Sequence, residues 1–115
     1  MQLNTVSKAT LAAVAGLAAS ASANSCKYGG SEMVLWGWVI IADGVPDIPG
    51  ICGGLWDNMN HFADCTLSNT HCGENENGEL RWEFYSPTGC GPGHVESAWW
   101  EATRNDFGDL QCERV

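Results

Sequence analysis

The chain has 115 residues, with 14 acidic residues against five basic ones, so its formal charge is −9 at pH 7. This length fits one small domain. No apolar run reaches the roughly 20 residues that cross a bilayer, so we expect neither a channel nor a transporter. The acidic balance repels phosphate backbones and anionic headgroups, so we expect no nucleic-acid partner and no membrane insertion.

Residues 1–23 are typical of a secretory signal peptide. Lys8 supplies a positive charge, residues 9–19 form a weakly apolar run, and residues 21–23 have the small-x-small form that signal peptidase cleaves. An ordinary N-terminal helix is the alternative, but an alanine run without a polar face would pack poorly on a small domain. We therefore expect a secreted mature chain of residues 24–115, which keeps four basic and 14 acidic residues and has a net charge of −10.

All six cysteines belong to this mature chain. An even number in a small exported protein is typical of a disulfide framework, because such a domain buries little apolar surface and uses cross-links worth about 2–4 kcal/mol each. No C-x-x-C pair occurs, which argues against a zinc ribbon or a thioredoxin-like site. We expect three disulfides among Cys26, Cys52, Cys65, Cys72, Cys90 and Cys112.

The first half of the mature chain predicts a strand and a helix. Residues 33–42 are β-branched and aromatic, and they are apolar on both faces, as in a central strand. Pro49 suits the first turn of a following helix, which we expect to end near Ala63. Its apolar stripe is interpreted as a core face rather than a ligand pocket, and consists of Ile51, Leu55, Met59 and Phe62.

The second half repeats the pattern. Residues 65–72 fit a short edge strand, and residues 79–86 alternate strictly between apolar and polar side chains. A second helix around Val95 to Ala102 is expected to be closed by Gly108, before a last strand over residues 110–115.

The resulting order, βαββαβ, suggests two split βαβ units. Right-handed crossovers then give an α+β, two-layer sandwich: a four-stranded antiparallel sheet, ordered fourth, first, third, second, with both helices on one face. Strand direction brings Cys52 and Cys72 to one end, which favours a disulfide between them. The other four cysteines gather at the opposite end, where we expect Cys26–Cys112 and Cys65–Cys90 while the full connectivity stays open.

Aromatic residues suggest a binding face. If Gly37 faces the helices, Trp36 and Trp38 point to the helix-free side of the sheet. The alternation of the third strand sends Arg81, Glu83 and Tyr85 to the same side. Together with the two tryptophans they are the candidate binding residues. Cover by loops is the alternative interpretation.

Histidines and carboxylates are the candidate groups for catalysis and metal binding. His61 and Asp64 stand one helical turn apart, but the spacing H-x-x-D is common, and we expect no metal. Arg81, Glu83 and His94 could meet near the end of the third strand and resemble the Glu, Arg and His set of small secreted fungal ribonucleases. Solvated strand charges are the simpler interpretation, so no catalytic residue is assigned and no cofactor is expected.

The signal peptide, the acidic cysteine-rich mature chain and the βαββαβ order resemble small secreted effectors of plant-associated fungi. Within these, the architecture resembles the subunits of the viral killer toxins of smut fungi. Residues 50–65 and 93–112 have the look of a fungal secreted-protein signature. The resemblance implies virulence or killing by binding a host or competitor protein or glycan outside the producer. We expect a monomeric, non-enzymatic binder, with a small ribonuclease-like secreted hydrolase as the alternative.

Overall fold

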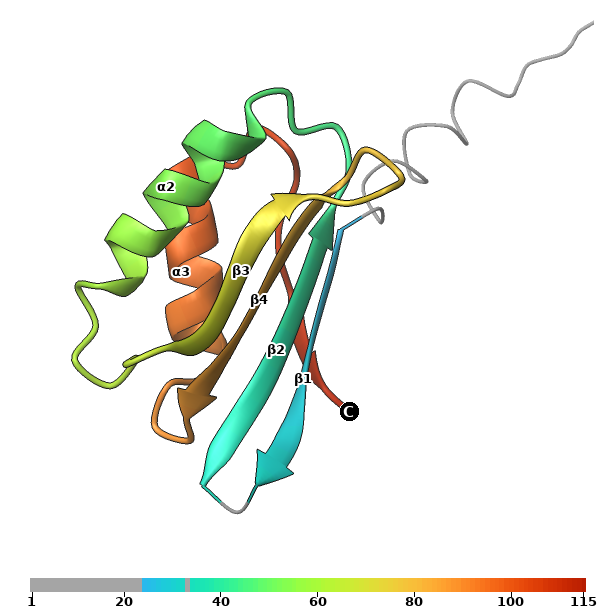
Figure 1. Cartoon of the computed structure of the whole chain (residues 1–115). Coiled ribbons are helices and arrows are strands. Elements are labelled where there is room, and N and C mark those ends of the chain that lie inside the picture. The colour runs from blue at the N-terminus through green and yellow to red at the C-terminus, as the bar shows by residue number, and fades with distance from the viewer. Residues whose placement is uncertain (1–23, 33) are drawn as a thin grey trace, which may run out of the picture.

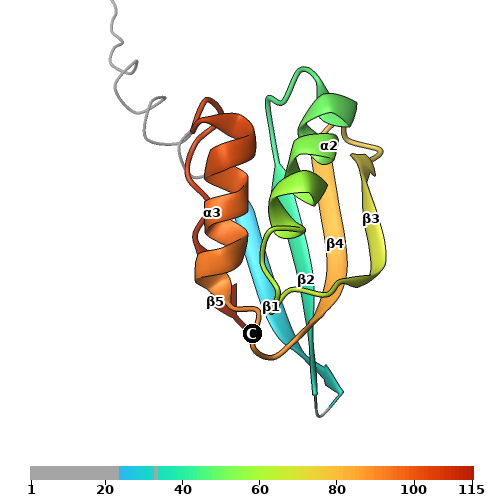
Figure 2. The same cartoon turned by 90° about the vertical axis from the view of Figure 1, so that its left-hand side faces the viewer.

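The computed structural model describes residues 24–32 and 34–115 and arranges them in two layers, a β-sheet and two α-helices that lie on one of its faces (Figures 1 and 2). The predicted signal peptide lies outside the described residues. In chain order the elements are β1 (Ser25–Glu32), β2 (Leu35–Ala42), α2 (Ile48–Met59), β3 (Ser68–Glu74), β4 (Leu80–Pro87), α3 (Pro92–Thr103) and β5 (Cys112–Arg114).

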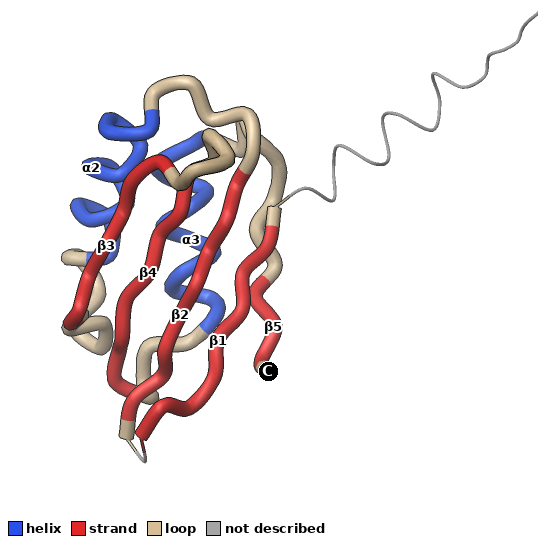
Figure 3. The backbone as a smooth tube through the Cα atoms, turned by 45° about the vertical axis from the view of Figure 1, so that its right-hand side comes forward, coloured by secondary structure: helices blue, strands red, loops and turns tan. Residues whose placement is uncertain are grey.

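The sheet has five strands in the order β3-β4-β2-β1-β5 (Figure 3). All neighbours are antiparallel except β1 and β5, which run parallel. The α+β class and the pair of helices are as predicted, but the four-stranded antiparallel sheet is wrong in detail. The predicted strand order survives as β5, β2, β4, β3, with the unpredicted β1 inserted between β5 and β2.

Strand β1 was missed because its sequence, SCKYGGSE, has two glycines and no β-branched residue, which gives it a low strand propensity. Its pairing on both sides compensates for this. It pairs with β2 from Ser25 opposite Ile41 to Gly30 opposite Trp36, and it pairs with β5 at its other edge. Tertiary pairing therefore outweighs the local preference.

Helix α2 starts as expected and ends early. The side chain of Asp47 caps its first turn by accepting a hydrogen bond from the Gly50 N–H (3.2 Å), and Pro49 occupies that turn. The helix ends at Met59 rather than near Ala63, so Phe62 lies beyond the helical stripe to which the pattern assigned it.

Helix α3 also ends before the predicted position. Arg104 takes the left-handed conformation (φ 54°) and caps the helix, and Gly108, with φ 93°, lies in the turn that follows. Gly108 has the positive φ expected of a residue that closes a helix, but it lies in this turn and not directly after α3. The helix is therefore one turn shorter than its glycine suggested.

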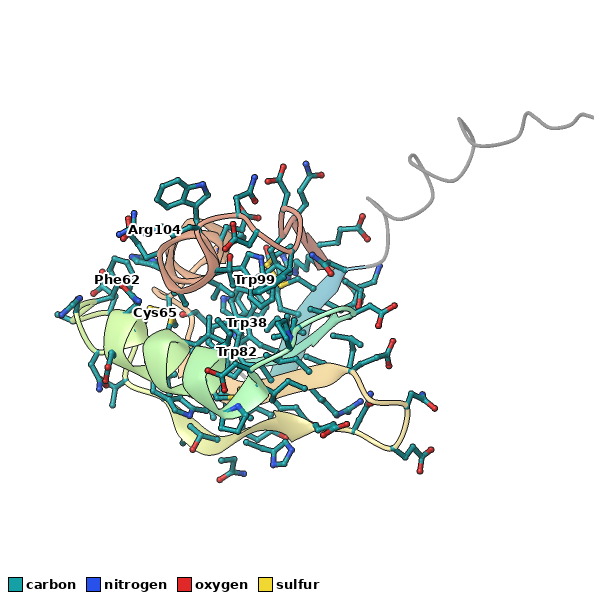
Figure 4. All side chains as sticks on the ribbon, turned by 90° about the horizontal axis from the view of Figure 1, so that it is seen from above. Trp38, Phe62, Cys65, Trp82, Trp99 and Arg104 are labelled. Carbon is teal, nitrogen blue, oxygen red and sulfur yellow. A yellow bond between two sulfur atoms is a disulfide. The ribbon has the colours of Figure 1, made fainter. Side chains whose placement is uncertain are left out.

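The core fills the space between the sheet and the helices (Figure 4). Strand β4 follows the predicted alternation: its apolar residues point at the helices and are at most 2% exposed. The larger buried side chains are Trp38, Ile40, Leu55, Met59, Leu80, Trp82, Phe84, Val95 and Trp99.

The structure has three disulfides, and the predicted pairs are confirmed. Cys26–Cys112 joins β1 to β5, Cys52–Cys72 joins α2 to β3, and Cys65–Cys90 joins the α2–β3 loop to the β4–α3 turn. Several disulfides in a chain of this size are typical of extracellular proteins. Neither helix in residues 24–32 and 34–115 is long and apolar enough to cross a bilayer.

Candidate functional site

Trp36 and Trp38 do not lie on the helix-free face, so this part of the predicted binding site is wrong. Trp38 is 1% exposed and lies in the core (Figure 4). It is stacked between Tyr28 and Phe84. Its indole N–H donates to the Ser86 hydroxyl at 2.9 Å. The side chain is therefore shielded from any partner.

Trp36 lies on the same side of the sheet as Trp38 and is partly buried. Its indole N–H donates to the Thr88 carbonyl at 3.2 Å, and the edge of Tyr28 meets its ring. The guanidinium of Arg114 stands 4.7 Å from the ring centroid, which adds a cation–π contact. Protein groups therefore occupy much of the surface that the prediction assigned to a ligand.

Gly37 explains the inverted faces. It pairs with Tyr85 across β2 and β4, and a Cβ atom built on it would lie 2.9 Å from the Tyr85 ring. Because glycine has no side chain, Gly37 leaves room for the Tyr85 ring on the helix-free face. It does not lie against the helices. Because β2 is apolar on both faces, its sequence alone left the two orientations equivalent.

The other three predicted residues, Arg81, Glu83 and Tyr85, do share the helix-free face with one another. Arg81 and Glu83 form a hydrogen-bonded ion pair, with side chains 40% and 34% exposed. Tyr85 is partly exposed opposite Gly37 of β2. Of the five predicted binding residues, the helix-free face therefore carries only the Tyr85 ring and the Arg81–Glu83 ion pair.

A depression of about 420 Å³ opens beside these residues, and we call it the sheet-face hollow. Its side walls include Asn69, which has φ 50° at an irregularity in the pairing of β3 with β4. Asparagine tolerates this left-handed conformation better than most residues. Sequence reasoning missed Asn69, whose signal was an asparagine inside an expected strand. The lining residues are Gly37, Trp38, Val39, Asn69, Glu83, Phe84 and Tyr85.

Two ion pairs lie on the helix-free face. Lys27 contacts Glu113 at 2.6 Å, and this hydrogen bond together with the lysine charge lowers the pKa of the Glu113 carboxyl below its usual value. Arg81 is paired with Glu83 in the same way. These two pairs are each electrically neutral, whereas the chain as a whole carries −9.

The trio of Arg81, Glu83 and His94, which the sequence offered as an alternative to solvated strand charges, does not form. His94 belongs to α3 in the helix layer, on the opposite side of the sheet from the Arg81–Glu83 pair. Its Nδ1 accepts a hydrogen bond from the Gly91 N–H at 3.0 Å, and its ring packs edge-on against Phe62. The histidine therefore caps a helix instead of meeting the carboxylate.

His61 and His94 are also candidate metal ligands. His61 and Asp64 are exposed in the loop after α2, because the helix ends before them. The potential ligand atoms of Cys65, Cys90 and His94 lie within 4.8 Å of one another. However, the two sulfur atoms form a disulfide, so neither is a thiolate available to an ion.

A second depression, of about 460 Å³, lies between the end of α2 and β3, and we call it the α2–β3 pocket. The sequence patterns do not predict this pocket, because they place Phe62 in the helix core and the residues from Cys65 onward in a strand. Its lining residues are Trp56, Asn60, Phe62, Ala63, Cys65, Thr66, Leu67 and Thr70.

The chain matches no family model, no curated protein and no solved structure. The resemblance to fungal effectors and smut killer toxins therefore rests on the sequence features described above.

Proposed function

We propose that this chain is a secreted binding protein that acts outside the producing cell, on a host or competitor target, as an effector or killer-toxin-like molecule. The supporting observation is the sheet-face hollow, where Tyr85 stands over Gly37 beside the Arg81–Glu83 pair. A partly exposed aromatic ring flanked by charged side chains is a common composition of an interaction hot spot.

Charge indicates what kind of target such a surface accepts. The chain carries −9, so its long-range field attracts basic partners and repels acidic ones. On the helix-free face Arg81 and Lys27 are already paired with carboxylates. A partner that docks there therefore does not have to remove water from these charges while they are unpaired. We therefore propose an extracellular protein with a basic surface around an apolar contact that meets Tyr85.

The test is a pull-down with the secreted protein from extracellular host fluid and from competitor culture medium. Tyr85→Ala should weaken retention of the specific partner roughly 30-fold, the equivalent of about 2 kcal/mol. Gly37→Ala, which pushes the tyrosine ring aside, should also weaken it. Trp100→Ala is the matched control, because Trp100 is 46% exposed on α3, away from this face. Equal retention by wild type and Tyr85→Ala would contradict the proposal.

A secreted hydrolase is the second candidate, and one observation favours it. His71 of β3 pairs directly with Glu83 of β4, so a histidine, a carboxylate and Arg81 come from neighbouring positions of the sheet. Such a set can exchange protons with a substrate. Glu83→Gln and His71→Ala would then abolish cleavage of RNA or glycans, whereas the binding function predicts that Tyr85→Ala has the largest effect.

A further inference from the structure

The α2–β3 pocket is a second concave site, separate from the sheet-face hollow. It lies on the helix side of β3, and its volume of about 460 Å³ is comparable with small-molecule sites, which span about 300–1,000 Å³. Two aromatic rings, Trp56 and Phe62, contribute to its lining together with Leu67. It has the mixed apolar and polar lining typical of ligand pockets.

Disulfides fix the walls of this pocket. Cys52–Cys72 ties α2, which carries Trp56, to β3, which carries Thr70. Cys65 is itself a lining residue, and its bond to Cys90 anchors the loop that closes the pocket. A ligand would therefore meet a preformed site and would order few groups on binding, which favours affinity.

The aromatic rings are also held in place. The Trp56 ring is edge-on to Trp82 and Phe84, at centroid distances of 5.8 and 6.4 Å. Phe62 is held edge-on by His94, at 4.9 Å. Both rings are only partly buried, so each keeps surface that a flat apolar group can contact.

The rim of the α2–β3 pocket carries polar side chains that can form hydrogen bonds but are uncharged. Asn60, Thr66 and Thr70 are exposed polar residues at the pocket, and none of its lining side chains is ionisable. This contrasts with a chain that has 14 acidic residues. A charged ligand would lose hydration there without gaining an opposite charge, so the pocket favours a neutral one.

We propose that the α2–β3 pocket binds a sugar unit of a neutral oligosaccharide. A sugar ring has an apolar C–H face that can stack on Trp56 or Phe62, and hydroxyl groups that can exchange hydrogen bonds with an amide and two threonine hydroxyls. This site does not depend on the sheet-face hollow, so the protein would attach to a glycan and to its target through different surfaces.

Isothermal titration calorimetry tests this with the full secreted chain. The ligands are neutral tetrasaccharides of N-acetylglucosamine, β-1,4-glucose, β-1,3-glucose and mannose, with tetragalacturonate as the anionic comparison. We expect at least one neutral tetrasaccharide to bind, and tetragalacturonate not to. Trp56→Ala and Asn60→Ala should each weaken binding about tenfold or more.

Two variants make the result specific. Asn60→Ala changes an exposed residue and should fold normally, which covers the case in which Trp56→Ala is unstable. Trp100→Ala removes an equally large ring from the outside of α3 and should bind the sugar like wild type. The proposal is overturned if no neutral tetrasaccharide binds, if tetragalacturonate binds best, or if Tyr85→Ala abolishes binding while Trp56→Ala and Asn60→Ala do not.

Discussion

At the scale of single residues, the tryptophans are mainly structural. Trp38, Trp82 and Trp99 are at most 1% exposed, and Trp100 stands outside at 46%. Burial of an indole normally requires a partner for its N–H. Trp99 donates to the Gly108 carbonyl at 2.9 Å and Trp38 donates to Ser86, whereas the Trp82 N–H has no hydrogen-bond partner among the described residues. A domain of this size therefore hides several large rings in its core.

The Trp38–Ser86 hydrogen bond leads to a first prediction. Both residues are at most 1% exposed, so Ser86→Ala leaves a buried N–H without this acceptor. The free energy of unfolding should fall by about 1–3 kcal/mol in a urea titration. Ser97→Ala, an exposed change on α3, should alter it by about 0.5 kcal/mol or less. If Trp38→Phe and Ser86→Ala prove additive, the two side chains are not coupled and the prediction is wrong.

Strands β4 and β2 show which residue positions the sequence could place. In β4, polar and apolar residues alternate, and the structure has Arg81, Glu83 and Tyr85 on the predicted face. In β2 both faces are apolar, so nothing in the local pattern decided where Trp38 should point. The direction of the Trp38 side chain depends on the close approach of Gly37 to Tyr85, and Tyr85 belongs to another strand, β4.

At the scale of elements, the types of structure were predictable and their ends were not. Strands β2 and β4 and both helices occur where the apolar patterns placed them, whereas β3 and β5 have no such pattern and lie only near their predicted ranges, at Ser68–Glu74 and Cys112–Arg114. β1 lacks such a pattern and exists through its pairing with β2 and β5. The hollow and the pocket were not predictable either, because an irregularity in β3 and the early end of α2 create them.

The two central glycines of α2 give a second prediction with its own control. A Cβ atom at Gly53 would meet nothing within 4 Å, whereas one at Gly54 would lie 3.3 Å from the Ala102 Cβ in α3. Gly53→Ala should therefore raise the free energy of unfolding by about 1 kcal/mol, since alanine favours the helix. Gly54→Ala should stabilise less or destabilise, because the two helices must separate. Equal gains in thermal unfolding would show that Gly54 has no packing role.

For the whole molecule, the cross-links could be predicted although one strand was missed. Inserting β1 between β2 and β5 leaves the direction of every predicted strand unchanged, so each cysteine stays at its expected end of the sheet. The reason for one pair differs, however. Cys26 and Cys112 bond because β1 and β5 are neighbours and place them directly opposite each other.

The disulfides should not contribute equally to stability. Cys26–Cys112 spans 86 residues and Cys52–Cys72 spans 20, so chain-entropy estimates give about 4.5 and about 3 kcal/mol. Replacing Cys26 and Cys112 with alanine should therefore lower the urea midpoint more than replacing Cys52 and Cys72. The same change frees the three-residue β5, whose Arg114 covers Trp36, so acrylamide should quench the tryptophan fluorescence more strongly. The reverse order of midpoints would mean that native contacts around α2 and β3, rather than loop closure, set the stability.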